Sequence, residues 1–190
     1  YWQVYLHKTV LAAEQMLVKT LQRARHLALR GVQLSVSPPL AYFLYRELDR
    51  DFVENNSLEL LEQFAQLDDF DVAGALKTFV HHSDSILSFL AYGLINRRLF
   101  KLELKNTPFA RDYVENIRQK VKREKTLPND DLSYLVFQGK ETNSAYSTAK
   151  DEINILFKNN NVLPMSESSD QEIRTSVITK YYLCYPKNIT

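Results

Sequence analysis

The sequence predicts a mainly α-helical protein with a C-terminal α+β appendage, in which a multi-helical core is followed by a small antiparallel sheet. Apolar residues recur at spacings of three and four up to about residue 99, as they do on the buried faces of helices. From residue 100 to 104 apolar and charged residues alternate, and strand-like segments prevail after residue 132. These observations divide the chain into a helical unit, 1–105, and a small α+β unit, 106–190.

The first 30 residues predict one long helix that forms the spine of the helical unit. Its apolar stripe consists of Leu6, Val10, Ala13, Leu17, Leu21, Ala24 and Ala28. Gly31 stands where a C-terminal cap belongs, and at about 1.5 Å per residue the helix would be roughly 45 Å long. The chain opens with Tyr1 already inside this pattern and has no initiator methionine, so we interpret it as a fragment of a longer protein.

Four shorter helices are expected next. They should lie at about 40–48 after Pro38-Pro39, from the cap Asn55-Asn56-Ser57 onward, at about 71–81, and at about 84–99 with Ser83 as the cap. The expected apolar set of the second helix is Leu58, Leu60, Leu61, Phe64 and Leu67. The side chains expected to face inward from the last helix are Ile86, Leu87, Leu90, Leu94 and Ile95.

In the C-terminal unit we expect a charged helix at about 110–124 and strands at 133–137, 153–157, 162–165 and 180–185. Asn159-Asn160-Asn161 separates two of these strands and predicts a hairpin turn, because asparagine tolerates a positive φ. The polar stretch 166–176 is expected to hold one short helical turn.

The composition excludes several classes of protein. With 24 Lys and Arg against 23 Asp and Glu, the net charge of +1 argues against a broad nucleic-acid or membrane surface. Four glycines without a phosphate-loop spacing argue against a Rossmann or P-loop protein. The single cysteine, Cys184, excludes an internal disulfide and favours a cytoplasmic protein, and we interpret it as a buried small hydrophobe.

Two groups of residues could bind a nucleotide. Tyr1, Tyr5 and Lys8 share one face of the predicted opening helix, with His7 beside it. A ring can stack on a base or sugar and a lysine can meet a phosphate, but an amphipathic helix has such a solvated face without any ligand. The run Asn96-Arg97-Arg98-Leu99-Phe100-Lys101 is either a phosphate-binding cluster or a set of cations that complements a helix C-terminus.

Two other polar groups are interpreted as helix ends. Adjacent histidines on a helix point about 100° apart and share a metal with difficulty, so His81-His82-Ser83-Asp84 is taken as a helix end followed by a cap. The cluster Asp68-Asp69-Phe70-Asp71 lacks the calcium-loop pattern and is taken as an N-cap.

Three groups of residues, in this order, resemble those of the HD-domain phosphohydrolases, and in particular the bacterial deoxynucleotide triphosphohydrolases. The first group is Tyr5-Leu6-His7-Lys8 ahead of a long helix. The second is Leu67 to Asp71, then Leu87 to Leu94, then the run 96–101, and the third is Ile155 to Lys158 with the closing Lys180 to Pro186. The resemblance covers most of residues 1–105 and the remainder more loosely. It implies an HD-domain-like core of which this chain is the C-terminal part.

The resemblance also implies a chemistry for the complete enzyme. Such enzymes hold a divalent metal of the Mn, Mg or Fe class through His, His-Asp and Asp ligands, and a metal-activated water releases triphosphate from a dNTP. Those ligands would precede Tyr1, so we expect no catalytic residue and no metal in this chain, and no dNTP hydrolysis by it. By the same resemblance Tyr5 would contact the substrate, and the phosphates of a regulatory nucleotide would be bound by His7, Lys8, Arg97 and Lys101.

Two hypotheses of function stay open. The chain is either the part of a dNTP triphosphohydrolase that supplies a substrate wall and a regulatory or oligomerisation surface, or a non-catalytic interaction module of an HD-type protein with another phosphohydrolase activity. In both cases the cut core should expose apolar surface, so we expect self-association through the opening helix.

Overall fold

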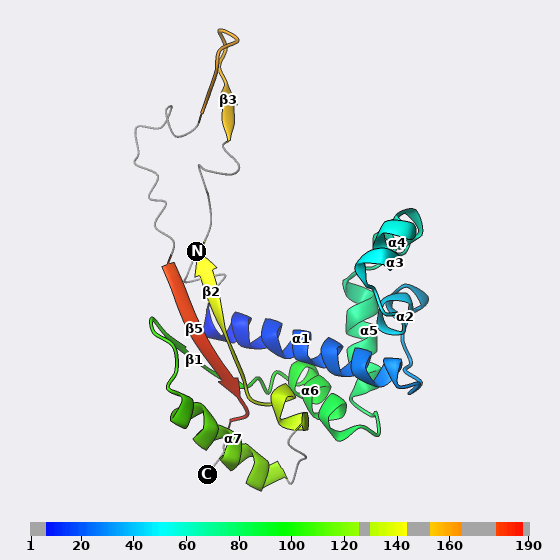
Figure 1. Ribbon diagram of the computed structural model, residues 1–190, viewed down its shortest axis with the longest axis vertical. Helices are drawn as coiled ribbons and strands as arrows, with labels where there is room; N and C mark the ends of the chain where they lie inside the picture. Colours follow the sequence, from blue (N-terminus) through cyan, green and yellow to red (C-terminus); the bar gives the residue numbers. More distant parts are fainter. Residues whose placement is uncertain (1–6, 126–129, 144–152, 165–177, 188–190) are drawn as a thin grey trace.

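The computed structural model describes residues 7–125, 130–143, 153–164 and 178–187. In this part of the chain a long helix, α1 (Lys8–Leu29), runs from a small sheet at one end to a group of shorter helices at the other (Figure 1). The predicted fold class, mainly α with an antiparallel sheet in the C-terminal part, is confirmed. The remaining helices are α2 (Pro38–Leu44), α3 (Arg50–Asn55), α4 (Ser57–Ala65), α5 (Asp69–Phe79), α6 (Ser85–Ile95) and α7 (Arg111–Lys125), together with the 3₁₀ turn η1 (Asp130–Tyr134).

The long helix ends as the sequence predicts but begins later. Gly31 has φ +81°, and its N–H donates to the carbonyl of Ala28 at 2.9 Å, which terminates the helix through a left-handed residue. At the other end the helix begins at Lys8, because His7 has extended backbone angles and acts as the N-cap. The predicted face can be followed only from Lys8 onward, because Tyr1 and Tyr5 lie outside the described residues.

The second helix begins at the prolines rather than after them. Pro38 and Pro39 form the first turn of α2, where a missing N–H removes no helical hydrogen bond, and the helix ends at Leu44. The predicted apolar set of α4 includes Leu58, Leu61 and Phe64, which share one face of the helix by their spacing. These three side chains are 78%, 61% and 62% exposed. Helical periodicity identifies an apolar face correctly but does not show what covers it.

Aspartates, not serine, begin the two following helices. Asp68 accepts hydrogen bonds from the N–H groups of Phe70 and Asp71, and the Asp71 carboxylate accepts from the N–H of Asp68, so a capping box begins α5. Asp84 accepts from the N–H of Leu87 at 2.8 Å and is the N-cap of α6, the position predicted for Ser83. The interpretation of the Asp68–Asp71 cluster as an N-cap is confirmed, whereas the predicted Ser83 cap is wrong by one residue.

The three-stranded sheet pairs strands that are far apart in the sequence. Strand β5 (Ile178–Tyr185) lies between β1 (Lys101–Lys105) and β2 (Phe137–Asn143), and both pairings are antiparallel. In this register Lys101 is opposite Tyr185, and both Leu102 and Phe137 are opposite Cys184. A separate hairpin joins β3 (Asn154–Leu156) to β4 (Val162–Pro164), and Asn160 at its turn has φ +62°, as the asparagine run predicts. The predicted helical turn at 166–176 lies outside the described residues.

The predicted strand at 133–137 is wrong. Residues up to Tyr134 form η1, and β2 begins only at Phe137. Leu132, Leu135 and Val136 are all buried, and the N–H groups of Leu135 and Val136 both donate to the carbonyl of Leu132. Three apolar residues at spacings of three and four bury one side of a helical turn, whereas a strand would send neighbouring side chains to opposite faces.

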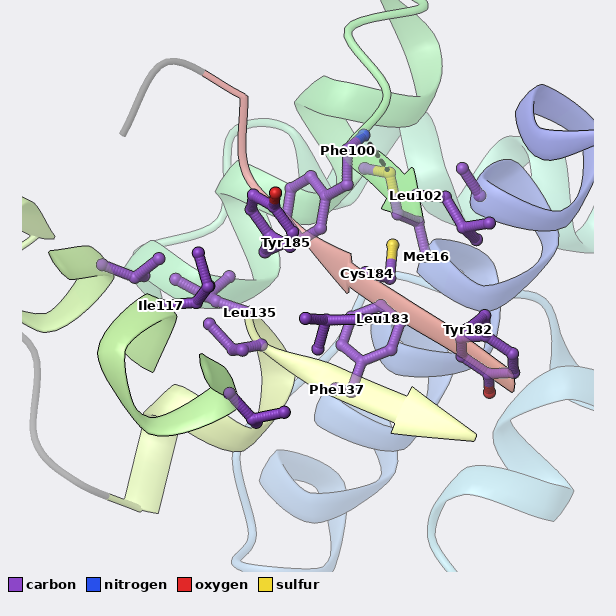
Figure 2. Close-up of a cluster of buried hydrophobic side chains, with 14 of the residues drawn as sticks. Met16, Phe100, Leu102, Ile117, Leu135, Phe137, Tyr182, Leu183, Cys184 and Tyr185 are labelled. Carbon is purple, nitrogen blue, oxygen red and sulfur yellow. Dashed lines mark hydrogen bonds between the residues drawn. The ribbon is translucent and has the colours of Figure 1, made fainter. Parts of the chain in front are cut away.

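One hydrophobic cluster joins helices and sheet (Figure 2). It contains Leu11, Met16, Ile86, Leu90, Phe100, Leu102, Val121, Leu135, Phe137, Leu183 and Cys184. A second cluster gathers the C-terminal half of α1 with α2, α5 and α6. Because α1 and α6 contribute to both clusters, the two packing regions share the same helices. The division at residue 105 stays a prediction.

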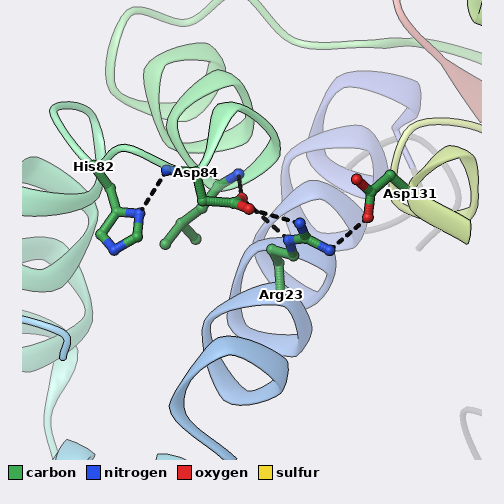
Figure 3. Close-up of polar contacts among 5 residues, drawn as sticks. Arg23, His82, Asp84 and Asp131 are labelled. Atoms are coloured by element: carbon green, nitrogen blue, oxygen red, sulfur yellow. Dashed lines mark hydrogen bonds and ion pairs between the residues drawn. The ribbon is translucent and has the colours of Figure 1, made fainter. Parts of the chain in front are cut away.

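A charged network links three elements beside these clusters (Figure 3). The Arg23 guanidinium on α1 contacts Asp84 at 2.6 Å and Asp131 of η1 at 2.6 Å. It also lies 5.2 Å from the centre of the Tyr134 ring. The His82 Nδ1 atom accepts a hydrogen bond from the N–H of Asp84, which confirms that the histidine pair marks a helix boundary.

Within the described ranges, no helix combines the length and apolar character that crossing a membrane would require.

Candidate functional site

Four cations surround one hollow where the start of α1, the end of α6 and the ends of two strands meet. This basic hollow has a volume of about 270 Å³ and is lined by Lys8, Thr9, Arg97, Leu99, Phe100, Lys101, Leu102 and Lys187. Three of the five predicted binding residues, Lys8, Arg97 and Lys101, therefore lie around the same space. None of the lining residues carries a negative charge.

The first wall is the beginning of α1. His7 caps the helix by accepting a hydrogen bond from the N–H of Thr9 to its Nδ1 atom at 3.3 Å. The first turn contains no acidic side chain. The hollow is thus lined by the Lys8 side chain and by the first turn of a 22-residue helix, which is the positive end of the helix dipole.

Arg97 is held in an unusual conformation on the second wall. It follows α6 with φ +54°, a left-handed value that costs a residue with a β-carbon about 1 kcal/mol. Its own N–H donates to the carbonyl of Leu94 at 3.2 Å, and the N–H of Arg98 donates to the carbonyl of Gly93 at 2.8 Å. This pair of hydrogen bonds is a Schellman motif, in which the position of Arg97 is usually a glycine.

The two arginines of the run point to different surroundings. Arg98 lies 5.5 Å from the centre of the Tyr92 ring, and Arg97 lines the hollow. A cation that complements the negative end of the α6 dipole does not need the left-handed conformation of Arg97. A glycine at this position would end the helix equally well. The conformation of Arg97 therefore favours the phosphate-binding interpretation of this run over the purely electrostatic one.

Lys101 is the third cation and has a carboxylate partner. Its Nζ lies 3.1 Å from the Oε1 of Glu103 and 5.4 Å from the centre of the Tyr185 ring. The hydroxyl of Tyr113 donates to the same carboxylate at 3.0 Å, and the hydroxyl of Tyr185 donates to it as well. Burial favours protonation of Glu103, but the hydrogen bonds from these three groups outweigh burial and lower its pKa.

The tyrosines that hold Glu103 stay neutral. Burial, together with their contacts to the carboxylate, raises the pKa of Tyr113 and of Tyr185 to about 12. Both phenols are therefore proton donors at neutral pH. They keep the Glu103 carboxylate ionised beside Lys101, so that Lys101 is partly neutralised in the absence of a ligand.

The floor of the hollow is part of the hydrophobic core. Phe100 and Leu102 are buried, and the N–H of Phe100 donates to the Met16 sulfur at 3.2 Å (Figure 2). Gly93 packs so closely on α1 that a β-carbon there would lie 2.8 Å from the terminal methyl carbon of Met16. These contacts fix the segment between α6 and β1 that carries Arg97 and Lys101.

Lys187 completes the set of cations and was not predicted. It follows β5, whose last residue, Tyr185, pairs with Lys101 in the antiparallel register. Lys187 is thereby placed beside the start of β1. The sequence signal was a lysine two residues after a predicted strand, but the partner of that strand could not be chosen from periodicity alone.

The other two predicted residues stand apart from this group. His7 caps α1 and is not one of the residues that line the basic hollow. Tyr5 lies outside the described residues.

The described ranges contain no group of three or more His, Cys, Asp or Glu side chains that could hold a metal ion. These residues therefore do not fit the ligand set that the resemblance implies. What the described site can do is bind an anion, because three lysines and an arginine converge on a space without carboxylates in its lining.

A solved structure matches nearly all of this chain, but the match covers less than half of the other protein. A phosphohydrolase from Bacteroides thetaiotaomicron has a crystal structure that matches 98% of this chain with a TM-score of 0.82 and 38% sequence identity. This chain resembles part of a phosphohydrolase. It spans 47% of the length of that protein.

A second relative matches a shorter stretch. The uncharacterised protein YwfO of Bacillus subtilis is 31% identical over 101 residues, which are 53% of this chain and 21% of YwfO. No protein-family model matches the chain. The comparisons thus relate the fold to part of a phosphohydrolase. The role of the residues in the basic hollow follows from their geometry.

Proposed function

We propose that this chain is the regulatory, nucleotide-binding part of a metal-dependent HD-type nucleotide phosphohydrolase that converts a dNTP to a deoxynucleoside and triphosphate. In this proposal the basic hollow binds the phosphates of a regulatory nucleotide. The observation that carries it is the convergence of Lys8, Arg97, Lys101 and Lys187 on one space. Residues from four separate elements meet there, which a run of charges on one helix would not produce.

The strain at Arg97 supports the same role. A left-handed arginine at a position suited to glycine lowers the stability of the fold, and such residues are concentrated at functional sites. An arginine offers a planar pair of donors that can bind two phosphate oxygens at once. Lys8, Lys101 and Lys187 add point charges around it.

Binding of inorganic triphosphate tests the proposal without requiring any catalysis. We expect the chain to bind it in isothermal titration calorimetry, with an affinity that falls as salt increases, because exposed charges are screened. Lys8→Gln and Lys187→Gln should each weaken binding about tenfold, the loss expected for one charge-assisted contact. Equal affinity in these variants and the wild type would contradict the proposal.

A matched control removes one positive charge elsewhere. Lys77 is exposed on α5, away from the lining of the hollow, so Lys77→Gln changes net charge equally. We expect it to leave the affinity for triphosphate within about twofold of the wild type, since surface charge at a distance is largely screened. A tenfold loss in this control would show that binding responds to net charge and not to the hollow.

The alternative is a non-catalytic interaction module that self-associates. It is favoured by the exposed face of α4 and by Val10 and Val18 on α1, which are 48% and 40% exposed. We propose a second copy of this chain as the occupant. Light scattering across a concentration series tests this: a mass that doubles supports it, and a constant monomer mass contradicts it. Leu58→Lys on α4 and Val18→Lys on α1 would identify the face that is used.

A further inference from the structure

A second hollow lies next to the first, between α7 and the end of β5. This tyrosine hollow has a volume of about 470 Å³ and is lined by residues that include Tyr113, Asn116, Lys120, Tyr185 and Lys187. Such a volume is in the range of small-molecule sites. It shares Lys101 and Lys187 with the basic hollow but not Lys8 or Arg97.

One face of α7 forms the first wall. Tyr113, Asn116, Ile117 and Lys120 are spaced three, four and seven residues apart, so their side chains follow one side of the helix. Ile117 is buried in the hydrophobic core, which attaches this helix to the sheet (Figure 2). The face therefore offers an aromatic ring, an amide and an ammonium group on a fixed support.

The ring of Tyr113 is already held in position. Its hydroxyl donates to Glu103 at 3.0 Å, and it stacks on Phe109 with ring centres 6.3 Å apart and planes at 16°. The Tyr113 residue is nevertheless 37% exposed. The Nζ of Lys105 also lies 5.3 Å from the centre of this ring, so a planar group would use the part of the ring that Phe109 and Lys105 leave exposed. Because the ring is fixed, such binding has a low cost in conformational entropy.

The charge and hydrogen-bonding groups of the tyrosine hollow are matched to an anion with a ring. Lys120 and Lys187 supply two positive charges, Lys101 adds a third that Glu103 partly neutralises, and the lining includes no carboxylate. The Asn116 amide is exposed on the same helix face and offers a donor and an acceptor together. Pro186 and Ile117 add apolar surface.

We propose that the tyrosine hollow is a second ligand site, which binds a nucleoside monophosphate. The phosphate is held by Lys120 and Lys187, the base lies on the ring of Tyr113, and the Asn116 amide meets the edge of the base. This inference goes beyond the triphosphate-binding role of the basic hollow and has its own residues. Because the two sites share Lys101 and Lys187, each ligand weakens the binding of the other.

Calorimetric titration of the chain with AMP, GMP and ribose 5-phosphate tests this proposal. We expect at least one of the two nucleotides to bind roughly fivefold or more tightly than ribose 5-phosphate, because a stacked base contributes affinity that a sugar phosphate lacks. Equal binding of all three ligands would overturn the proposal, since the hollow would then recognise phosphate alone. Absence of binding by both nucleotides would overturn it as well.

Variants separate this site from the basic hollow. Lys120→Gln should weaken nucleotide binding about tenfold and Tyr113→Leu roughly fivefold, whereas Lys8→Gln should change it less than about twofold. Asn116 occupies an exposed helix position that tolerates alanine, and Asn116→Ala should reduce any difference in affinity between AMP and GMP. Circular dichroism confirms that each variant is folded.

The possible failures are distinguishable. If Lys8→Gln abolishes nucleotide binding and Lys120→Gln has no effect, the nucleotide lies in the basic hollow and the second site does not exist. If triphosphate fails to bind but nucleotides respond to Lys120→Gln, the proposed function is wrong and the tyrosine hollow stands. Triphosphate added to a saturated nucleotide complex should lower the nucleotide affinity, and unchanged affinity would contradict the sharing of the two lysines.

Discussion

The N–H of Arg98 donates a hydrogen bond to the carbonyl of Gly93 at 2.8 Å, and this contact closes the end of α6 around a left-handed Arg97. A glycine at position 97 would keep both hydrogen bonds without the steric cost of a β-carbon. We therefore expect Arg97→Gly to raise the free energy of unfolding by about 0.5 to 1 kcal/mol in urea titrations. The same variant should bind triphosphate about tenfold more weakly, because one bidentate donor is lost.

Arg98→Gly is the matched control for this trade between stability and binding. Arg98 lies over the Tyr92 ring and does not line the basic hollow. Its replacement should leave triphosphate affinity within about twofold and should not stabilise the fold, since glycine brings extra unfolded-state entropy without relief of strain. An Arg97→Gly variant that is both less stable and unchanged in binding would refute the role given to this residue.

The charge run at 96–101 shows how far the sequence could lead. Its residue types allow a phosphate cluster or a set of cations at a helix end, and both descriptions fit the letters equally well. The three-dimensional structure distinguishes the two interpretations, through the φ of Arg97 and through the different surroundings of the Arg97 and Arg98 side chains. A left-handed arginine, unlike a glycine or an asparagine, leaves no mark on composition or periodicity.

Local signals were reliable where one residue decides the geometry. Gly31 ends α1 and Asn160 forms the hairpin turn, because both tolerate a positive φ. Signals that depend on tertiary partners were less reliable. The same apolar spacing of three and four lies on the core in η1 and on the surface in α4, and Lys187 joined the site only through the pairing of β5 with β1.

The Arg23–Asp84 ion pair makes the stability of the fold depend on pH. Burial pushes the pKa of Asp84 upward, but the hydrogen bonds from Arg23 and from the Leu87 N–H, with the charge of Arg23, outweigh it and lower the pKa. An unfolded aspartate titrates near pH 3.9, so the stabilisation is fully present above about pH 4 and is lost as the pH falls further, through the folded value.

Asp84→Asn isolates this charge, since asparagine is as good an N-cap as aspartate. At neutral pH we expect it to lower the free energy of unfolding by about 2 kcal/mol, the loss expected for a charged hydrogen-bonded contact. The difference from the wild type should shrink below about pH 4, as the wild-type carboxylate becomes protonated. The exposed Asp51→Asn should differ from the wild type by about 0.5 kcal/mol or less throughout. A pH-independent effect of Asp84→Asn would contradict the ion-pair account.

Gly139 and Tyr182 form a cross-strand pair in which the ring occupies the place of the missing side chain. They are opposite each other in β2 and β5, and a β-carbon on Gly139 would lie 2.5 Å from the Tyr182 hydroxyl oxygen. That hydroxyl donates to the Gln15 side chain of α1 at 2.8 Å. Gly139→Ala should therefore lower the free energy of unfolding by about 1 to 3 kcal/mol, as overpacking does.

A double-mutant cycle separates this contact from strand propensity. In a Tyr182→Ala background the ring is gone, and Gly139→Ala should be neutral or stabilising because alanine is less costly than glycine in a strand. A coupling energy near zero in urea titrations of the four proteins would show that the ring does not depend on the glycine.

Glu103 competes with any anionic ligand for Lys101. It lies 3.1 Å from the Lys101 Nζ and is held there by the hydroxyls of Tyr113 and Tyr185. Glu103→Gln keeps an acceptor for both tyrosines and removes the negative charge. We expect triphosphate to bind about fivefold more tightly to this variant, which corresponds to roughly 1 kcal/mol of relieved competition. Glu54→Gln, an equal charge change on the exposed surface of α3, should leave calorimetric affinity unchanged. Weaker binding by Glu103→Gln would mean that the carboxylate positions Lys101 for the ligand and does not compete for it.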